Sequence, residues 1–191
     1  MDWILVTGQP GAGKTTAVKR ITEFLQQRGV TCKGFYTEEV VGPTKSRIGF
    51  DVVTIPDKSR GVLARKEGIK SKYKCGQYFV DVQSFEKLAI PSLALAADAE
   101  EQKGTVFILD EIGRMELFST QFQDQVRHLA IQNVRLVGAV TAPRYGHRVA
   151  YCDEITSLDH VHVHKLTKKT RDDVTDELLK SMESRWEDLL E

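Results

Sequence analysis

A glycine-rich segment near the start of the chain has the residue types and spacing that bind phosphate groups. Residues 8–15 read GQPGAGKT and match the pattern G-x-x-x-x-G-K-[ST] in full. Glycines let backbone N–H groups approach phosphate oxygens closely, and the N-terminus of a following helix adds partial positive charge. We therefore expect a nucleotide-binding P-loop, whose binding residues are Gly8, Gln9, Pro10, Gly11, Ala12, Gly13, Lys14, Thr15 and Thr16.

Three side chains at the end of this segment are expected to contact phosphates and a metal ion. Lys14 can reach the β- and γ-phosphates, the Thr15 hydroxyl can bind Mg²⁺, and Thr16 can donate to the α-phosphate. An ordinary glycine turn is the alternative, but the complete pattern between a predicted strand and a predicted helix argues against it. A dinucleotide fingerprint is excluded, because Thr16 stands where its third glycine should be.

A second motif places two carboxylates at the end of an apolar run. Residues 106–111 read VFILDE, which is typical of a buried strand that delivers an acidic residue at its C-terminal end. Asp110 is expected to hold Mg²⁺, directly or through water, and Glu111 to polarise water at the γ-phosphate. Taken alone, such a strand end usually starts a solvated loop, but the upstream glycine-rich segment favours the functional interpretation.

Alternating strands and helices must position these motifs. An apolar strand over 3–7, a helix over 15–28 and a strand over 32–37 form a βαβ unit, which predicts a parallel pair with a right-handed crossover. The chain is expected to be one α/β domain over 1–191, a mostly parallel sheet with helices on both faces. Further strands are predicted at 105–110, 135–141 and around 161–163, and further helices over 84–101 (broken at Pro91), 120–131 and 170–190, the last opened by a capping box at Thr170.

The middle of the chain departs from this alternation. The β-rich segments 48–55 and 78–82 have no helix between them, which indicates an antiparallel hairpin or flap inserted over about 45–82. The intervening stretch 56–76 is rich in glycine and lysine. It could cover the phosphates or simply be a solvated charged face.

Composition limits the partners and the compartment. Lys plus Arg and Asp plus Glu are both 27 in this 191-residue chain, so nothing overall favours nucleic acid or an anionic membrane. The three cysteines are widely spaced without a CxxC pair, which fits a reducing compartment. The apolar run at 3–6 is too short for a signal peptide or a membrane span. We expect a cytoplasmic monomer whose partners are nucleoside triphosphates.

Several motifs in order resemble the signatures of one family. The segments GFYTEE (34–39), RIGFD (47–51), GQYFVD (76–81) and DEIGRMEL (110–117) look like those of a small P-loop nucleoside-triphosphatase family, the cancer-related nucleoside-triphosphatase type. The similarity runs from Trp3 to about Leu179. It implies a RecA-like core and Mg²⁺-dependent hydrolysis of several nucleoside triphosphates to diphosphate and phosphate, with loose base selectivity.

The resemblance also points to residues outside the two main motifs. Members of the family usually carry Thr-x-x-Asn-Arg before the last helix, and here residues 167–171 read TKKTR, with Thr170 in place of Asn. Arg171 is expected to border the base, and Gly113 the nucleotide.

Four arginines are candidates for phosphate contacts. Arg47 could reach phosphate or base, or form a surface ion pair. Arg114 could stabilise γ-phosphate charge in cis, as an arginine finger does, or cap a helix. Arg144 and Arg148 are alternative fingers.

Two other functions share these motifs. A nucleotide or small-molecule kinase would need an acceptor pocket and a lid, whereas the insertion is β-rich and Glu111 is placed for water. A guanine-reading switch would want N-K-x-D, which Lys165–Lys169 does not supply.

Overall fold

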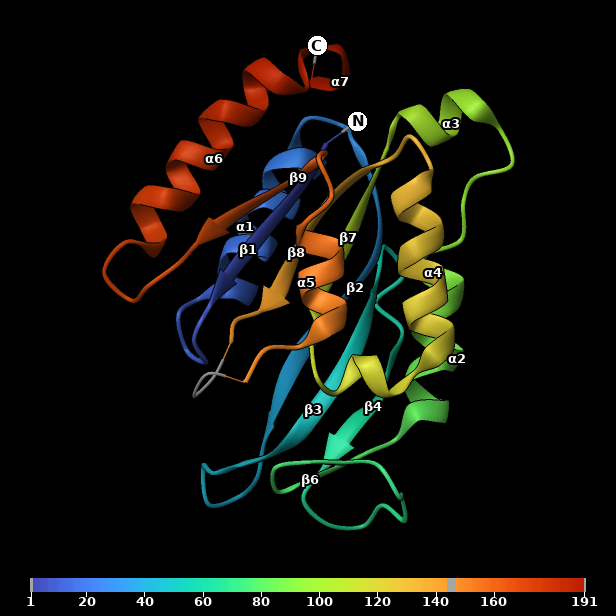
Figure 1. Cartoon of the computed structure of the whole chain (residues 1–191), viewed down its shortest axis with the longest axis vertical. Coiled ribbons are helices and arrows are strands. Elements are labelled where there is room, and N and C mark those ends of the chain that lie inside the picture. The colour runs from blue at the N-terminus through green and yellow to red at the C-terminus, as the bar shows by residue number, and fades with distance from the viewer. Residues whose placement is uncertain (1, 144–146, 191) are drawn as a thin grey trace.

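The computed structural model describes residues 2–143 and 147–190, which form one nine-stranded sheet with helices on both faces (Figure 1). The strands lie in the order β5-β6-β4-β3-β2-β7-β8-β1-β9. Their bounds are β1 Trp3–Gly8, β2 Thr31–Val41, β3 Arg47–Ile55, β4 Arg60–Arg65, β5 Lys74–Cys75, β6 Tyr78–Val80, β7 Thr105–Ile112, β8 Arg135–Thr141 and β9 Val161–Lys165. The helices are α1 Lys14–Gln27, α2 Val82–Ser92, α3 Ala99–Lys103, the 3₁₀ helix η1 Glu116–Phe118, α4 Thr120–Ile131, α5 Ala150–Thr156, α6 Arg171–Arg185 and α7 Glu187–Leu190.

One half of the sheet is parallel. β2 pairs with β7, β7 with β8, β8 with β1 and β1 with β9, all in parallel register. The predicted α/β class with a mostly parallel sheet is confirmed. Because β8 lies between β1 and β7, the glycine-rich segment after β1 and the acidic end of β7 reach the same edge of the sheet, one strand apart.

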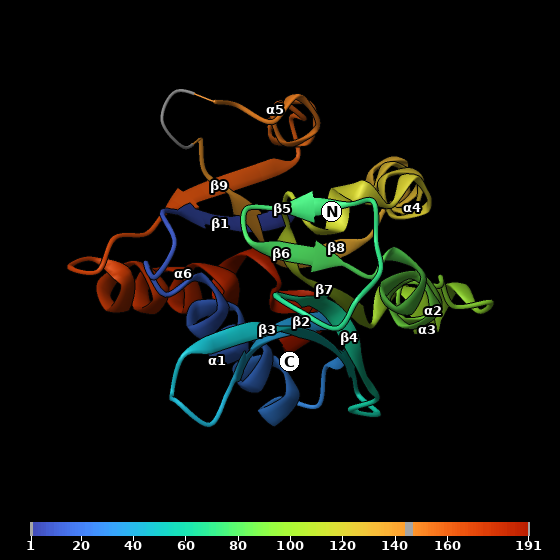
Figure 2. The same ribbon diagram turned by 90° about the horizontal axis from the view of Figure 1, so that it is seen from below.

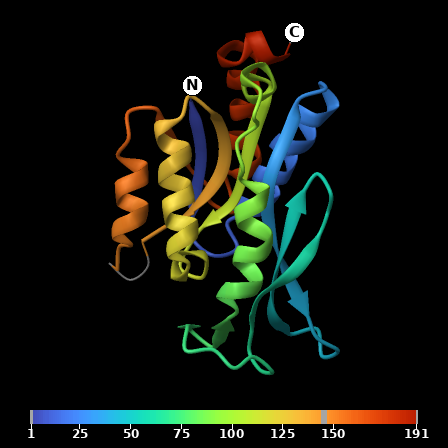
Figure 3. The same ribbon diagram turned by 90° about the vertical axis from the view of Figure 1, so that its right-hand side faces the viewer.

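Alternating side chains of the central strands enter two separate apolar layers. Trp3 and Leu5 of β1 join the layer under α2, α4 and α5, whereas Ile4 and Val6 join the layer under α1 and α6. Figures 2 and 3 show α2 and α4 on the opposite side of the sheet from α1 and α6. Trp186 at the end of α6 completes the second layer, and both Trp3 and Trp186 are almost fully buried, at 0% and 1% exposure.

The other half of the sheet is the antiparallel extension expected for the middle of the chain. β3, β4, β6 and β5 pair antiparallel beyond β2 and project past the carboxyl ends of the parallel strands (Figure 3). The stretch 56–76 contains two strands that were not predicted, β4 and β5. Leu63 and Ala64 are buried in the layer under α2, which holds β4 despite its basic neighbours.

Two helix predictions need correction, and one helix was missed. The helix predicted over 84–101 is two helices: α2 continues through Pro91 to Ser92, and α3 begins after Asp98, whose side chain accepts from Glu100 N and Glu101 N. The short helix α5 was not predicted. At α6, the Thr170 side chain makes no cap hydrogen bond within the described chain, because its hydroxyl lies 3.0 Å from that of Thr167.

Candidate active site

The glycine-rich segment forms a loop that leaves helix amides free for an anion. Gly11 and Gly13 have φ values of 78° and 97°, a left-handed conformation that glycine adopts at little cost. Gly13 is the N-cap of α1 and brings no side chain to bond the first amides of the helix. The first turn of α1 contains no acidic residue. The first N–H groups of the helix can therefore bind phosphate oxygens, as predicted for this motif.

Lys14 and Glu111, one from each motif, meet in the structure. Lys14 Nζ lies 3.2 Å from Glu111 Oε2 and donates to Gly8 O at 3.2 Å. Their side chains are 12% and 26% exposed, so the pair is only partly open to solvent. A phosphate bound in the loop would compete with Glu111 for the Lys14 ammonium.

Asp110 is a buried carboxyl without a partner. It is 1% exposed, and neither of its side-chain oxygens has a hydrogen-bond partner within residues 2–143 and 147–190. Burial and the negative charge of Glu111 raise the pKa of Asp110 to about 7, while Thr15 and Lys14 oppose the rise. A buried carboxyl of this kind is stabilised by a bound cation.

A magnesium ion fits these residues. The two unpartnered oxygens of Asp110 are hard ligands, and the Thr15 hydroxyl is near enough to lower the pKa of Asp110. No group of three or more His, Cys, Asp or Glu residues that could hold a metal occurs in the described chain. The protein alone would leave the coordination shell incomplete, so phosphate oxygens and water must supply the remaining ligands.

The connection between β9 and α6 brings two basic side chains to the loop. A Cβ on Gly13 would lie 2.8 Å from Arg171 Cδ, so Arg171 lies directly over this glycine. A Cβ on Gly11 would lie 3.9 Å from Lys168 Cε. The structure thus brings the predicted Arg171 to the loop and adds Lys168, which was not predicted.

A cavity of about 600 Å³ opens beside this loop. The residues that line it come from the loop itself, the end of β8 and the β9–α6 connection. Its volume lies within the range of small-molecule pockets. The Gln9 side-chain amide at its edge donates to Pro143 O at 3.0 Å. The lining comprises Thr7, Gly8, Gln9, Pro10, Ala12, Ala142, Pro143, Lys165, Leu166, Thr167 and Lys168.

The four candidate arginines make other contacts or cannot be placed. Arg47 donates to Tyr78 Oη at 3.0 Å and pairs with Glu39, which matches the alternative of a surface ion pair. Arg114 is exposed and donates to His147 O at 3.1 Å. Arg148 pairs with Asp153 at 2.8 Å. Arg144 lies outside the described residues.

Two acidic residues near the site were missed by the sequence reasoning. Glu116 is buried beside Gly113. Glu38 of β2 accepts from Lys19 Nζ at 2.8 Å, and Lys19 also lies 4.0 Å from the ring centre of Tyr36, the register partner of Asp110. The sequence pattern predicts that Lys19 lies on a helix, but only the folded structure brings its side chain to Glu38 of β2.

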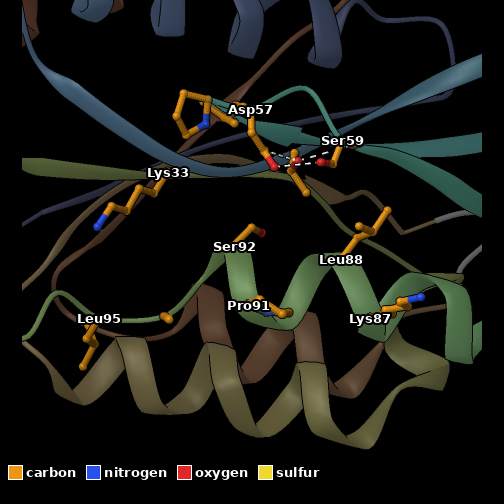
Figure 4. A pocket seen from close by; sticks show the side chains of 12 residues that line it. Lys33, Asp57, Ser59, Lys87, Leu88, Pro91, Ser92 and Leu95 are labelled. Carbon is orange, nitrogen blue, oxygen red and sulfur yellow. Dashed lines mark hydrogen bonds between the residues drawn. The ribbon is translucent and has the colours of Figure 1, made fainter.

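A second cavity, of about 380 Å³, lies away from this site between the β3–β4 turn and α2 (Figure 4). At its wall, Asp57 accepts hydrogen bonds from Thr54 Oγ1 at 2.5 Å and from Ser59 Oγ at 2.7 Å. Its lining contains none of the residues of the two motifs.

No helix in the described part of the chain is long and apolar enough to cross a bilayer.

Comparisons with known proteins extend over almost the whole chain. A family model described as NTPase matches residues 3–179. The cancer-related nucleoside-triphosphatase homolog of Bos taurus is 40% identical over 186 residues, which cover 95% of this chain and 96% of the relative. Nucleoside-triphosphatase THEP1 of Aquifex aeolicus is 40% identical over 183 residues, covering 94% and 98%.

Two solved structures share the fold. The crystal structure of THEP1 from Aquifex aeolicus superposes with a TM-score of 0.79 at 37% identity, covering 95% of this chain and 99% of that one. The solution structure of a human cancer-related nucleoside triphosphatase also gives 0.79, at 38% identity, covering 96% and 98%.

Proposed function

The chain belongs to the NTPase family, and we propose that it hydrolyses nucleoside 5′-triphosphates to nucleoside diphosphate and phosphate in a Mg²⁺-dependent reaction. One observation carries the proposal. Lys14 and Glu111 lie 3.2 Å apart, beside the loop that can bind phosphates and next to the unpartnered carboxyl of Asp110.

The proposed site binds the triphosphate through the glycine-rich loop. Backbone N–H groups of residues 11–16 surround the phosphates, and Lys14 balances charge on the β- and γ-phosphates. Asp110 and Thr15 hold Mg²⁺, which neutralises charge on the phosphate oxygens when it is bound. Gly113 and Arg114 lie next to these groups in the chain, and Arg114 is our candidate for an additional positive charge at the γ-phosphate.

Glu111 acts on the attacking water. Once the nucleotide draws Lys14 away, the Glu111 carboxylate is available to accept a proton from water. The water oxygen then bonds to the γ-phosphorus as the bond to the bridging oxygen breaks, and the nucleoside diphosphate leaves. The antiparallel insertion is part of the central sheet and is not a helical lid, which favours water over a bound acceptor and thus hydrolysis over the kinase alternative.

The nucleoside is proposed to occupy the 600 Å³ cavity beside the loop. Its walls offer Pro10, Ala12 and Leu166, which contact a base without reading its edge. The Gln9 amide is already bonded to Pro143 O. Such a pocket supports the use of several bases.

The test is phosphate release from ATP, GTP, CTP, UTP and the corresponding diphosphates, with Mg²⁺ and with excess EDTA, and with and without added acceptor compounds. We expect release from all four triphosphates, only with Mg²⁺, and no faster with an acceptor. Lys14→Ala is the inactive control. Transfer of phosphate to an acceptor in place of release would replace this proposal with the kinase alternative.

We also propose that the protein works as a cytoplasmic monomer without nucleic acid. The balance of 27 basic and 27 acidic residues and the absence of a CxxC pair in the sequence support this. Light scattering after gel filtration would give the mass of the particle, and a dimer mass would contradict the monomer.

A further inference from the structure

The antiparallel extension carries an uneven share of the charge of the chain. Residues 42–80 contain nine Lys or Arg and three Asp or Glu, although the two types are equal in number over the whole chain. The rest of the chain therefore has an acidic excess, and the extension is a basic projection from it. Figure 3 shows this projection past the carboxyl ends of the parallel strands, which is the end of the sheet that bears the glycine-rich loop.

Four lysines of the extension keep a charge that the protein does not balance. They lie between the end of β4 and the start of β5 and form the lysine cluster: Lys66, Lys70, Lys72 and Lys74. None of the four forms an ion pair within residues 2–143 and 147–190. Two arginines of the same extension differ in this respect, since Arg60 and Arg65 bond the buried carboxylate of Asp51 at 3.0 and 2.5 Å. The free positive charge of the extension is thus concentrated in the lysine cluster.

Aromatic rings hold part of the cluster in place. Lys72 Nζ lies 5.1 Å from the ring centre of Tyr73. Lys74 Nζ lies 5.0 Å from the ring centre of Phe79. An aromatic face attracts an ammonium group through its quadrupole and leaves the charge of that group intact. The ring of Tyr73 lies 5.2 Å from the ring of Phe118 in η1, centre to centre, and this contact joins the cluster to the segment that follows the acidic end of β7.

Building on the nucleotide site proposed above, we propose that the lysine cluster attracts the nucleoside triphosphate electrostatically and raises the rate at which it reaches the glycine-rich loop. A triphosphate is a compact polyanion, and positive charges around a site accelerate its association without contacting it in the bound state. The cluster suits this role because its charge is not neutralised, whereas the Lys14 ammonium at the loop is paired with Glu111 before nucleotide binds.

The test measures the association rate constant kon by stopped-flow fluorescence with N-methylanthraniloyl-ATP and Mg²⁺. In Lys72→Glu/Lys74→Glu, both replaced side chains are exposed. At an ionic strength of about 10 mM, where the Debye length is about 30 Å, we expect kon to fall about fivefold or more. At about 1 M, where the Debye length is about 3 Å, the difference from the wild type should disappear. The dissociation rate constant and kcat should be unchanged, because the cluster does not contact the bound nucleotide.

Two control variants separate the position of the charge from its sum and from packing. Lys87→Glu/Lys180→Glu changes the net charge by the same amount at exposed positions of α2 and α6, outside the extension, and should lower kon by less than about twofold. Lys72→Arg/Lys74→Arg keeps the charge and should keep the wild-type kon. The loss in Lys72→Glu/Lys74→Glu should also be smaller for labelled ADP than for labelled ATP, because ADP carries less charge.

Several results would contradict the proposal. They are equal losses in the two Lys→Glu pairs, a loss that persists at 1 M salt, and a comparable loss in the arginine variant. Nucleotide binding and phosphate release by the wild type, with an unchanged kon in Lys72→Glu/Lys74→Glu, would refute only the role of the cluster. A wild-type protein that binds no nucleotide would refute both this inference and the proposed function.

Discussion

Lys14 Nζ lies 3.2 Å from Glu111 Oε2, so the cation proposed to bind phosphate and the carboxylate proposed to activate water are paired with each other in the nucleotide-free protein. Within the described residues, neither Lys14 nor Glu111 forms a second ion pair. If the proposed site is right, binding of a triphosphate exchanges the carboxylate partner of Lys14 for phosphate oxygens and releases Glu111. The two residues should consequently fail in different ways when they are replaced.

Replacing the lysine should remove nucleotide binding together with turnover. Lys14→Ala leaves Glu111 and Asp110 facing the phosphates without the nearest ammonium, so electrostatic repulsion adds to the lost contact. We expect no measurable phosphate release and a Kd for Mg·ATP weakened by at least about tenfold, or 1.4 kcal/mol, in calorimetry. Lys180→Ala on the exposed side of α6 is a suitable control. Wild-type affinity in Lys14→Ala would remove Lys14 from the phosphate site.

Replacing the glutamate should spare binding. Glu111→Gln keeps the shape and removes a negative charge near the γ-phosphate, so ATP affinity should be unchanged or tighter. Loss of the group that orients water should lower kcat by about 10² or more. Single-turnover hydrolysis and calorimetry on the same variant test both parts. Near wild-type hydrolysis would exclude Glu111 as the base, direct attention to Asp110 or to residues near Arg114 and Arg144, and favour the kinase alternative.

Turnover should require a divalent ion. In the proposed site, Asp110 and Thr15 would supply only part of the ligands that Mg²⁺ needs, and nucleotide phosphates and water would supply the rest. Excess EDTA should abolish phosphate release, and Asp110→Asn should raise the Mg²⁺ concentration needed for half-maximal rate. Undiminished turnover in EDTA would contradict the assignment of both residues.

The stability of the metal-free protein should fall as pH rises. The pKa of Asp110 increases from an ordinary 3.8 to about 7 on folding, so the folded form binds this proton more tightly than the unfolded form. The stability that the protonated Asp110 contributes is fully present below about pH 3.8 and is lost progressively as pH rises to about 7. In EDTA, Tm should decrease between about pH 5 and about pH 7.5. Asp110→Asn should flatten the profile without abolishing it, because Glu116 shifts in the same direction. A rising Tm across this range would contradict the burial argument.

Base selectivity should be weak. The residues of the proposed site are assigned to phosphates and metal, and the cavity beside the loop has mainly apolar walls. Values of kcat/KM for ATP, GTP, CTP and UTP should therefore lie within about a hundredfold, or 2.7 kcal/mol. A larger preference would mean that a residue such as Thr167 or Lys168 reads the base edge.

The parts of the site that are continuous in sequence could be predicted, whereas the parts assembled by the fold could not. The loop at 8–15 and the strand ending at Asp110 carry their geometry in local residue order. Glu116 appears in sequence as one acidic residue in a turn, and nothing local signals its burial. Lys168 reaches Gly11 only because β9 pairs beside β1.

The same limit applies to the fold. Long apolar strands such as β7 are evident from their own residues. β4 lies in a stretch rich in basic residues, and its Leu63 and Ala64 are held by packing against α2, which the sequence does not reveal. The break between α2 and α3 follows from the cap at Asp98, a signal that was present in the sequence but overlooked.

Each apolar layer contains one of the two tryptophans, so tryptophan fluorescence can follow each layer separately. Trp3 lies in the layer under α2, α4 and α5, and Trp186 in the layer under α1 and α6. Neither indole N–H has a hydrogen-bond partner in the described structure, so both rings should emit at short wavelength. Trp3→Phe and Trp186→Phe would then each leave a single emitter, and the red shift of that emitter in denaturant would show whether the two faces of the sheet open together or one before the other.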